Sequence, residues 1–216
     1  MLEPKLVTVF GGSGFIGRYV CEQLLEYNEY EVRLRVVTRE PRTANFIQPL
    51  AQVGQFGFVR GDVTDRDSVR RAVEGSSAII NLTGSFNDMY AVHADGARHI
   101  AEATRDFGAK SLVHISAIGA DVEGEAIYGR TKGEGEQAVR DAFPNATIIR
   151  PSIVFGIEDM LTNRLAAMSR LPTLPVIAPK SRLQPVYVED LATAITRAAL
   201  DPAAHGGKTY EIGGPQ

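Results

Sequence analysis

The stretch Gly11-Gly12-Ser13-Gly14-Phe15-Ile16-Gly17 decides the fold of this chain of 216 residues. It follows the short apolar run Lys5–Phe10, which is typical of a strand buried on both faces. It leads into a segment from Phe15 to about Tyr27 whose apolar residues recur at helical spacing. A glycine-rich turn between a strand and a helix predicts a loop that binds the pyrophosphate of a dinucleotide.

The spaced glycines of this turn have separate predicted roles. Gly11 permits a tight turn, Gly14 lets the backbone approach the pyrophosphate, and Gly17 lets the helix pack closely on the strand. Free N–H groups and the positive end of the helix attract the phosphates. The alternative is an ordinary turn whose glycines are incidental. The predicted pyrophosphate-binding residues are Gly11, Ser13, Gly14, Phe15, Ile16 and Gly17.

Strand-like and helix-like segments alternate further along the chain. Short apolar runs predict the strands Val32–Thr38, Phe56–Arg60, Ala78–Leu82, Leu112–Ile115 and Thr147–Arg150. Helical periodicity predicts a helix that opens at a capping box of Thr64 and Asp67, and two more over about 87–107 and 125–143. This alternation is typical of an α/β protein with a Rossmann doubly wound parallel sheet and helices on both faces.

The pattern changes after Pro151, where prolines become frequent. The remaining sequence predicts helices over about 159–170 and 189–200, and strands over about 184–188 and 209–212. We therefore expect two domains. Residues 1–150 form the NAD(P)-binding Rossmann domain, and residues 151–216 form a small C-terminal α/β substrate subdomain, which is either minimal or truncated.

The composition excludes several classes of protein. A net charge of -3 without a basic stripe gives no reason to expect nucleic-acid binding. No apolar run approaches the roughly 20 residues that span a bilayer. The single cysteine, Cys21, favours a reducing compartment, and we expect a cytoplasmic protein or one on the mitochondrial matrix side. No metal site is expected, because the four histidines show no ligand spacing with cysteine or carboxylates.

The residues that end the second predicted strand bear on the choice between NADP and NAD. An NAD site usually places an Asp or Glu there, about 20 residues past the glycines, to bind the ribose 2′-hydroxyl. Here Thr38 and Arg39 occupy this end, and an arginine can pair with a 2′-phosphate and stack on the adenine. NADP(H) is therefore favoured. NAD(H) stays open, because Glu40 could serve a ribose and Arg39 could be a solvated loop residue.

Residues after the next two strands complete the predicted cofactor site, because ligands of such sheets bind at the carboxyl ends of the strands. Asp62 and Val63 follow the third strand, where the carboxylate would meet the adenine amino group. Leu82, Thr83 and Gly84 follow the fourth strand and would pass beneath the adenosine ribose. Each of these residues could also simply be a residue of the kind that commonly ends a strand, with no ligand to bind.

Three further residues form a candidate catalytic set. Ser116 ends the fifth strand, and Tyr128 and Lys132 are four residues apart on one face of the next helix. A tyrosine can give a proton to a carbonyl oxygen if a nearby ammonium favours its phenolate form. Lys132 would supply that ammonium and bind the nicotinamide ribose, while Ser116 would orient the substrate oxygen. The alternative is an exposed helix face that carries Tyr128 and Lys132 by chance.

Together these residues resemble the short-chain dehydrogenase/reductase superfamily from end to end. More narrowly, the chain is similar to the atypical branch that contains the nucleotide-binding accessory subunit of respiratory complex I (alpha subcomplex subunit nine) and its bacterial relatives. The segments that carry the resemblance are 9–17, 114–121, 150–156, 184–190 and 210–215. The resemblance implies bound NADP(H), with Pro151, Ser152 and Ile153 lining its nicotinamide end.

The resemblance leaves three hypotheses open. The first is an enzyme that reduces a carbonyl, on a quinone-related or isoprenoid-like molecule, with NADPH. The second is a binding protein, either an accessory subunit of respiratory complex I at the membrane or a cofactor-sensing regulator. The third, a nucleotide-sugar epimerase or dehydratase, would want a larger substrate domain.

Two departures from the superfamily pattern bear on this choice. His93 stands where extended members often carry an Asn credited with a proton relay, although it could equally be a hydrogen-bonded structural histidine. The chain also ends at Gln216, where relatives continue. Both departures favour the binding protein, whereas the presence of Ser116, Tyr128 and Lys132 favours the reductase.

Overall fold

The computed structural model describes residues 5–26, 32–41, 45, 49, 51–169 and 183–215. Its main element is a seven-stranded sheet with the strand order β3-β2-β1-β4-β5-β6-β9, in which every neighbouring pair is parallel. The strands are β1 (Lys5–Phe10), β2 (Val32–Thr38), β3 (Phe56–Arg60), β4 (Ala78–Asn81), β5 (Ser111–Ile115), β6 (Thr147–Pro151) and β9 (Thr209–Ile212). This order confirms the predicted Rossmann doubly wound sheet.

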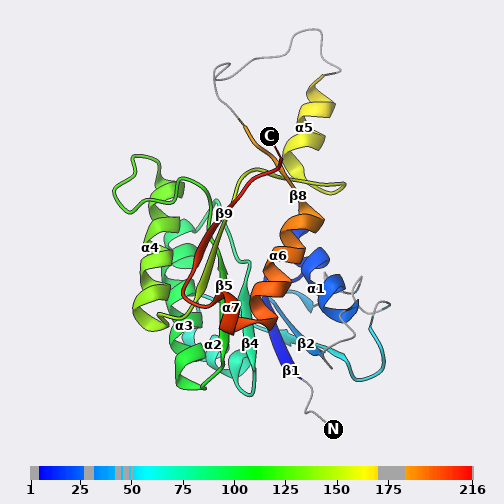
Figure 1. Ribbon diagram of the computed structural model, residues 1–216, viewed down its shortest axis with the longest axis vertical. Helices are drawn as coiled ribbons and strands as arrows, with labels where there is room; N and C mark the ends of the chain where they lie inside the picture. Colours follow the sequence, from blue (N-terminus) through cyan, green and yellow to red (C-terminus); the bar gives the residue numbers. More distant parts are fainter. Residues whose placement is uncertain are drawn as a thin grey trace.

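Helices cover both faces of the sheet (Figure 1). On one face lie α1 (Phe15–Glu26) and α6 (Val188–Leu200), and on the other lie α2 (Arg66–Val73), α3 (Gly96–Asp106) and α4 (Ile127–Ala142). Alternate residues of the strands supply the two apolar layers beneath them. Val7 and Val9 of β1 contact the α1 and α6 side, whereas Phe10 and Ile79 contact the α2 and α3 side.

The start of α2 differs from the prediction. Asp65, and not Thr64, caps the helix, because its side chain accepts hydrogen bonds from the backbone N–H groups of Asp67 and Ser68. Thr64 instead donates its hydroxyl to the Asp62 carboxylate, 2.9 Å away. The predicted capping box of Thr64 and Asp67 is therefore wrong, although the helix itself forms.

A π-helix over Tyr90–Asp95 precedes α3, where the sequence predicted one continuous α-helix. Such wide turns are rare and often lie at functional sites. Here the π-helix buries His93, and Gly135 of α4 packs so closely that a Cβ at that position would collide with the His93 carbonyl oxygen. The glycines of α4 thus serve close packing.

The chain after Pro151 lies partly in the main sheet and partly outside it. β9 pairs with β6 in parallel, and Leu191 and Ile195 of α6 are fully buried in the core beneath α1. The two-stranded sheet of β7 (Val154–Phe155) and β8 (Val186–Tyr187) and the helix α5 (Met160–Met168) lie apart from it (Figure 1). A boundary at residue 150 stays a prediction, but the sheet continues past it.

The short helix α7 (Pro202–His205), which the sequence analysis did not predict, joins α6 to β9. Asp201 caps it by accepting a hydrogen bond from the Ala204 N–H, and Pro202 occupies the first turn. In the part of the chain that the structure describes, no helix is both long and apolar enough to cross a membrane.

Candidate functional site

The glycine loop joins β1 to α1 at the carboxyl edge of the sheet. Gly11 has a φ of 78°, a value that favours glycine, and its carbonyl oxygen accepts a hydrogen bond from the Gly14 N–H at 3.0 Å. A Cβ on Gly17 would lie 2.6 Å from the Gly12 Cα. Both glycines are therefore required by the turn itself, and the first amides of α1 point out of it without intrahelical partners.

A pocket of about 370 Å³ opens beside this loop, between the ends of β1, β2, β3 and β4. It is lined by most of the residues that were predicted to bind the adenosine half of the cofactor. These are Gly11, Ser13, Gly14, Thr38, Arg39, Asp62, Val63, Leu82, Thr83 and Gly84, together with Phe10, Val37, Glu40, Gly61, Ser85 and Val92. The sheet thus gathers side chains from four strand ends around one hollow.

Arg39 is exposed at the mouth of this pocket, next to Asp62. Hydrogen bonds from Thr64 hold the pKa of the Asp62 carboxyl below its usual range against the effect of burial, and the positive charge of Arg39 adds to this. Thr38 is buried, and its hydroxyl accepts the N–H of Glu40 at 3.2 Å. The pocket therefore offers the exposed Arg39 guanidinium next to the ionised Asp62 carboxylate, with Glu40 also in its lining.

Buried polar side chains of β4, β5 and the π-helix hold the loop after β4 in place. The Asn81 side-chain oxygen accepts the Thr83 N–H at 3.0 Å, and its amide nitrogen donates to His114 Nδ1 at 3.0 Å. Burial lowers the pKa of His114 to about 3. His93 Nε2 accepts the Ser85 N–H at 3.0 Å. These contacts fix the loop 83–85 that lines the pocket.

The three predicted catalytic residues lie where β5 meets α4. Ser116 is buried directly after β5, Lys132 is buried and donates to the Ile115 carbonyl oxygen at 3.1 Å, and Tyr128 lies one helical turn before Lys132. Tyr128 is 36% exposed, and its ring stacks on that of Phe86 with centroids 5.4 Å apart. These residues belong to neighbouring elements but line no part of the pocket described above.

The charges of this group differ from the sequence-based expectation. Burial raises the pKa of Tyr128, whereas Lys132 was expected to favour its phenolate. Burial lowers the pKa of Lys132 to about 8, and the negative charge of Glu136 opposes that effect. Tyr128 is thus a protonated phenol, and burial alone makes it a weaker acid than a free tyrosine.

The remaining predicted cofactor residues occupy other places. Phe15 contacts Gly156 with its ring, and Ile16 packs against the core beside α1. Pro151 ends β6, and the backbone N–H of Ser152 donates to the Ile212 carbonyl oxygen at 2.8 Å. Ile153 accepts a backbone hydrogen bond from Val186. A role for these residues in cofactor binding stays a prediction.

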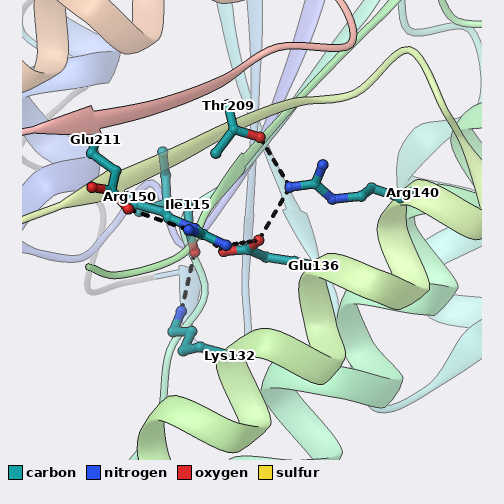
Figure 2. Close-up of polar contacts among 7 residues, drawn as sticks. All are labelled: Ile115, Lys132, Glu136, Arg140, Arg150, Thr209 and Glu211. Carbon is teal, nitrogen blue, oxygen red and sulfur yellow. Dashed lines mark hydrogen bonds and ion pairs between the residues drawn. The ribbon is translucent and has the colours of Figure 1, made fainter. Parts of the chain in front are cut away.

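The sequence analysis missed an ion-pair network around the buried Glu136 carboxylate, which lies near Ser116. Glu136 of α4 accepts two hydrogen bonds from Arg150 of β6, both at 2.8 Å, and one from Arg140 at 3.2 Å (Figure 2). A signal was present, because Glu136 follows Lys132 by four residues on the same helix face. Nothing in the local sequence indicated Arg150 as its partner, because the two are joined only by the tertiary fold.

The sequence matches the NAD dependent epimerase/dehydratase family over residues 7–213. Subunit 9 of the mitochondrial NADH dehydrogenase (ubiquinone) 1 alpha subcomplex of Mus musculus is 34% identical to it, over 97% of this chain and 57% of that subunit. The ceramide reductase of Caulobacter vibrioides is 30% identical, over 91% of this chain and 62% of that reductase. The chain thus spans only part of each relative's length.

Among solved structures, the terminal R domain from the myxalamid PKS-NRPS biosynthetic pathway is similar to this chain with a TM-score of 0.80. The similarity covers 99% of this chain and 66% of that one, at 20% sequence identity. At this identity the likeness concerns the fold alone.

Proposed function

This chain belongs to the NAD dependent epimerase/dehydratase family, and on that premise we propose that it is an NADP(H)-dependent reductase of carbonyl groups. Family membership implies a nicotinamide dinucleotide as its cofactor. The observation that carries the proposal is that Ser116, after β5, lies next to the start of α4 with Tyr128 and Lys132, at the same carboxyl edge of the sheet as the glycine loop before α1.

The pocket supports the cofactor assignment on steric and electrostatic grounds. A Cβ on Gly11 would lie 3.1 Å from the Leu82 carbonyl oxygen, so only glycine leaves the hollow between β1 and β4 open. Arg39 at its mouth suits a 2′-phosphate, which is why we propose NADP(H) over NAD(H). Asp62 keeps one carboxylate oxygen for an adenine amino group, because its Oδ1 already accepts from Thr64.

The bound cofactor would supply the hydride for the reduction. Tyr128, which is protonated at neutral pH, would give its phenolic proton to the carbonyl oxygen that becomes the alcohol. Lys132 would hold the nicotinamide ribose with N–H groups not used by the Ile115 carbonyl, and its positive charge would stabilise the phenolate that Tyr128 leaves. Ser116 would hold the substrate oxygen with its buried hydroxyl.

Exposed apolar side chains around Tyr128 support a substrate that is itself apolar. Phe86, 71% exposed, covers one face of the Tyr128 ring, and Ile127 precedes it at 51% exposure. Ile118, on the loop after β5, is 49% exposed. An apolar wall beside a proton donor suits a ketone or quinone on a long hydrocarbon chain.

A second function, a non-catalytic NADPH-binding subunit of a respiratory complex, has two observations in its favour. His93 Nε2 accepts from the backbone N–H of Ser85, a group that does not pass on a proton, which argues against a relay through this ring. The mouse relative is a subunit of mitochondrial NADH dehydrogenase. In this case NADPH would stabilise the fold without being consumed, and the protein would lie at the membrane through its partner subunits.

One experiment separates these two functions. We would follow NADPH oxidation by the purified chain with long-chain ketones, aldehydes and quinones, in parallel with NADPH binding. We expect turnover of at least one of these, and a loss of roughly hundredfold or more in Tyr128→Phe with NADPH binding unchanged. Tyr90→Phe is the matched control, because Tyr90 is a nearby exposed tyrosine that contacts Arg130. NADPH binding without any turnover would favour the subunit.

A further inference from the structure

The Glu136 carboxylate is buried, whereas its partner Arg150 is only partly buried, and a buried charge requires an explanation. The Glu136 side chain is 5% exposed and accepts Arg150 Nε and Nη2 on its two oxygens, each at 2.8 Å. Removing charges from water costs free energy that their attraction repays only partly. An apolar pair would hold α4 to β6 as well, so packing alone does not account for this carboxylate.

The network extends from Glu136 in two directions (Figure 2). Arg150 also donates to Glu211 at 3.2 Å, and Arg140 donates to Thr209 at 2.9 Å, so that α4, β6 and β9 are tied together. In the other direction, Lys132 lies one helical turn before Glu136, and its ammonium donates to the Ile115 carbonyl oxygen. Glu136 therefore lies on α4 between Lys132 and the contacts of Arg150 and Arg140 that tie α4 to β6 and β9.

Burial opposes the positive charge of Lys132, and the neighbouring groups offer little compensation apart from Glu136. His93 on the π-helix and His114 on β5 both lie near enough for Lys132 to lower their pKa values, and burial keeps both neutral. Tyr128 on the same helix is a neutral phenol. The Glu136 carboxylate stays ionised because hydrogen bonds from Arg150, with smaller help from Ser116 and Arg140, outweigh its burial.

Ser116 is a second proposed catalytic residue that lies near the Glu136 carboxylate. Its hydroxyl lies near enough to Glu136 to help to lower the pKa of that carboxyl, although it makes no hydrogen bond of full geometry with a described residue. The Glu136 carboxylate thus lies near both Ser116, which would hold the substrate oxygen, and Lys132, one turn earlier on the same helix.

We propose that Glu136 is a positioning residue, whose buried carboxylate keeps Lys132 protonated at the Ile115 carbonyl and which Arg150 holds in place from β6. The inference rests on the proposed function, because that function gives Lys132 its role in the reaction. The test measures only the protonation of Lys132 and does not depend on that function. A protonated Lys132 is what the proton transfer from Tyr128 requires, since the ammonium stabilises the phenolate that forms. Glu136 and Arg150 would thus contribute to catalysis through Lys132, without touching the substrate or the cofactor.

The test is a pH titration of the lysine side chains by NMR in the full chain without nucleotide. The five lysines of the sequence are Lys5, Lys110, Lys132, Lys180 and Lys208. The Lys132 signal is assigned by its loss in Lys132→Arg. In the wild-type protein it should titrate with a midpoint near the value of about 8 that burial and Glu136 together set.

The two partners of the ion pair should move this midpoint in opposite directions. Glu136→Gln removes the carboxylate and leaves Arg150 and Arg140 nearby, so the midpoint should fall by about one pH unit. Arg150→Gln leaves the carboxylate with less compensation, so the midpoint should rise. Glu134→Gln, which removes the same charge from the same helix, should leave it unchanged.

A different result is expected if the ion pair of Glu136 and Arg150 only holds α4 against β6. Loosening α4 would expose Lys132 in both variants and move both midpoints upward, toward that of a free lysine. Shifts in one direction, or a Glu136→Gln midpoint equal to that of Glu134→Gln, would overturn the proposal. If Glu136→Gln does not fold, Arg150→Gln and the charge-conserving Glu136→Asp decide the matter, the latter keeping the wild-type midpoint. Failure of NADPH to bind would affect the proposed function and not this result.

Discussion

His93 Nε2 accepts a hydrogen bond from the backbone N–H of Ser85, with 3.0 Å between the nitrogens. Because a backbone N–H can only donate, Nε2 carries no proton, and the neutral ring is protonated on Nδ1. Nδ1 lies 2.9 Å from Thr131 Oγ1, and the Thr131 hydroxyl donates in turn to the Tyr128 carbonyl oxygen. The chain of bonds joins the pocket loop to the start of α4 and requires an uncharged histidine.

This requirement predicts an acid-sensitive stability. Burial and the charge of Lys132 lower the pKa of His93 to about 4, below the ordinary value of 6.5. The unfolded chain therefore takes up a proton at a higher pH than the native protein, and stability falls as the pH drops from about 6.5 toward 4. His93→Asn should remove about 1.4 kcal/mol per pH unit from the slope of unfolding free energy in this range.

Urea unfolding at several pH values measures that slope. Gly57→Ala, at a residue on β3 that does not titrate and has open space around it, is the control and should keep the wild-type slope. His114 is also buried and contributes a slope of its own, so some acid sensitivity should persist in His93→Asn. A slope unaffected by His93→Asn would show that the ring is not held neutral.

Arg39 should decide the preference for NADP(H). Arg39→Asp removes the guanidinium at the mouth of the pocket and places a carboxylate near Asp62, so NADPH affinity should fall tenfold or more while NADH affinity changes little. Calorimetric titrations with both nucleotides measure the two effects. Arg33→Asp, an exposed change at the other end of β2, should alter neither. An equal loss for both nucleotides would refute the 2′-phosphate assignment.

Gly17 should be intolerant of any side chain. A Cβ there would lie 2.6 Å from the Gly12 Cα, and backbone cannot yield as a flexible side chain can. Gly17→Ala should therefore lower the unfolding free energy by about 1–3 kcal/mol. It should also abolish measurable nucleotide binding, because α1 must move away from the loop. Gly57→Ala, on β3 with open space around it, is the comparison variant and should be nearly neutral in both assays.

Phe86 should contribute to binding of apolar substrates. Its ring stacks on Tyr128 and is mostly exposed, so Phe86→Ala removes apolar surface without opening the core. The KM for a long-chain ketone should rise by about twofold to tenfold, the range expected of one aromatic contact. The KM for a short, polar ketone should stay the same. A kcat loss with unchanged KM would indicate that Phe86 acts on the Tyr128 proton instead.

The sequence predicted the sheet and the pocket well, for a physical reason. The bounds of β1, β2, β3 and β9 agree with those predicted. Burial explains this for β1 and most of β2, whereas the edge strands β3 and β9 are partly exposed. Their ends meet at one edge, which brought Gly11, Thr38, Asp62 and Thr83 together as expected.

Other features could not be read from local sequence. The π-helix that buries His93 is only six residues long, too short for its wider turn to be told from an α-helix by the spacing of apolar residues. The protonation states of Tyr128 and Lys132 depend on burial, and the pairing of Glu136 with Arg150 depends on how α4 packs against β6. These properties arise from contacts between segments far apart in the chain.

The central claim is that the junction of β1 and α1 binds a nicotinamide dinucleotide. Isothermal titration of the purified full chain with NADPH tests it most directly, with Gly17→Ala alongside. We predict saturable binding of one NADPH per chain by the wild-type protein and none by Gly17→Ala. Absence of heat with both NADPH and NADH at millimolar concentration, or equal binding by Gly17→Ala, would contradict it.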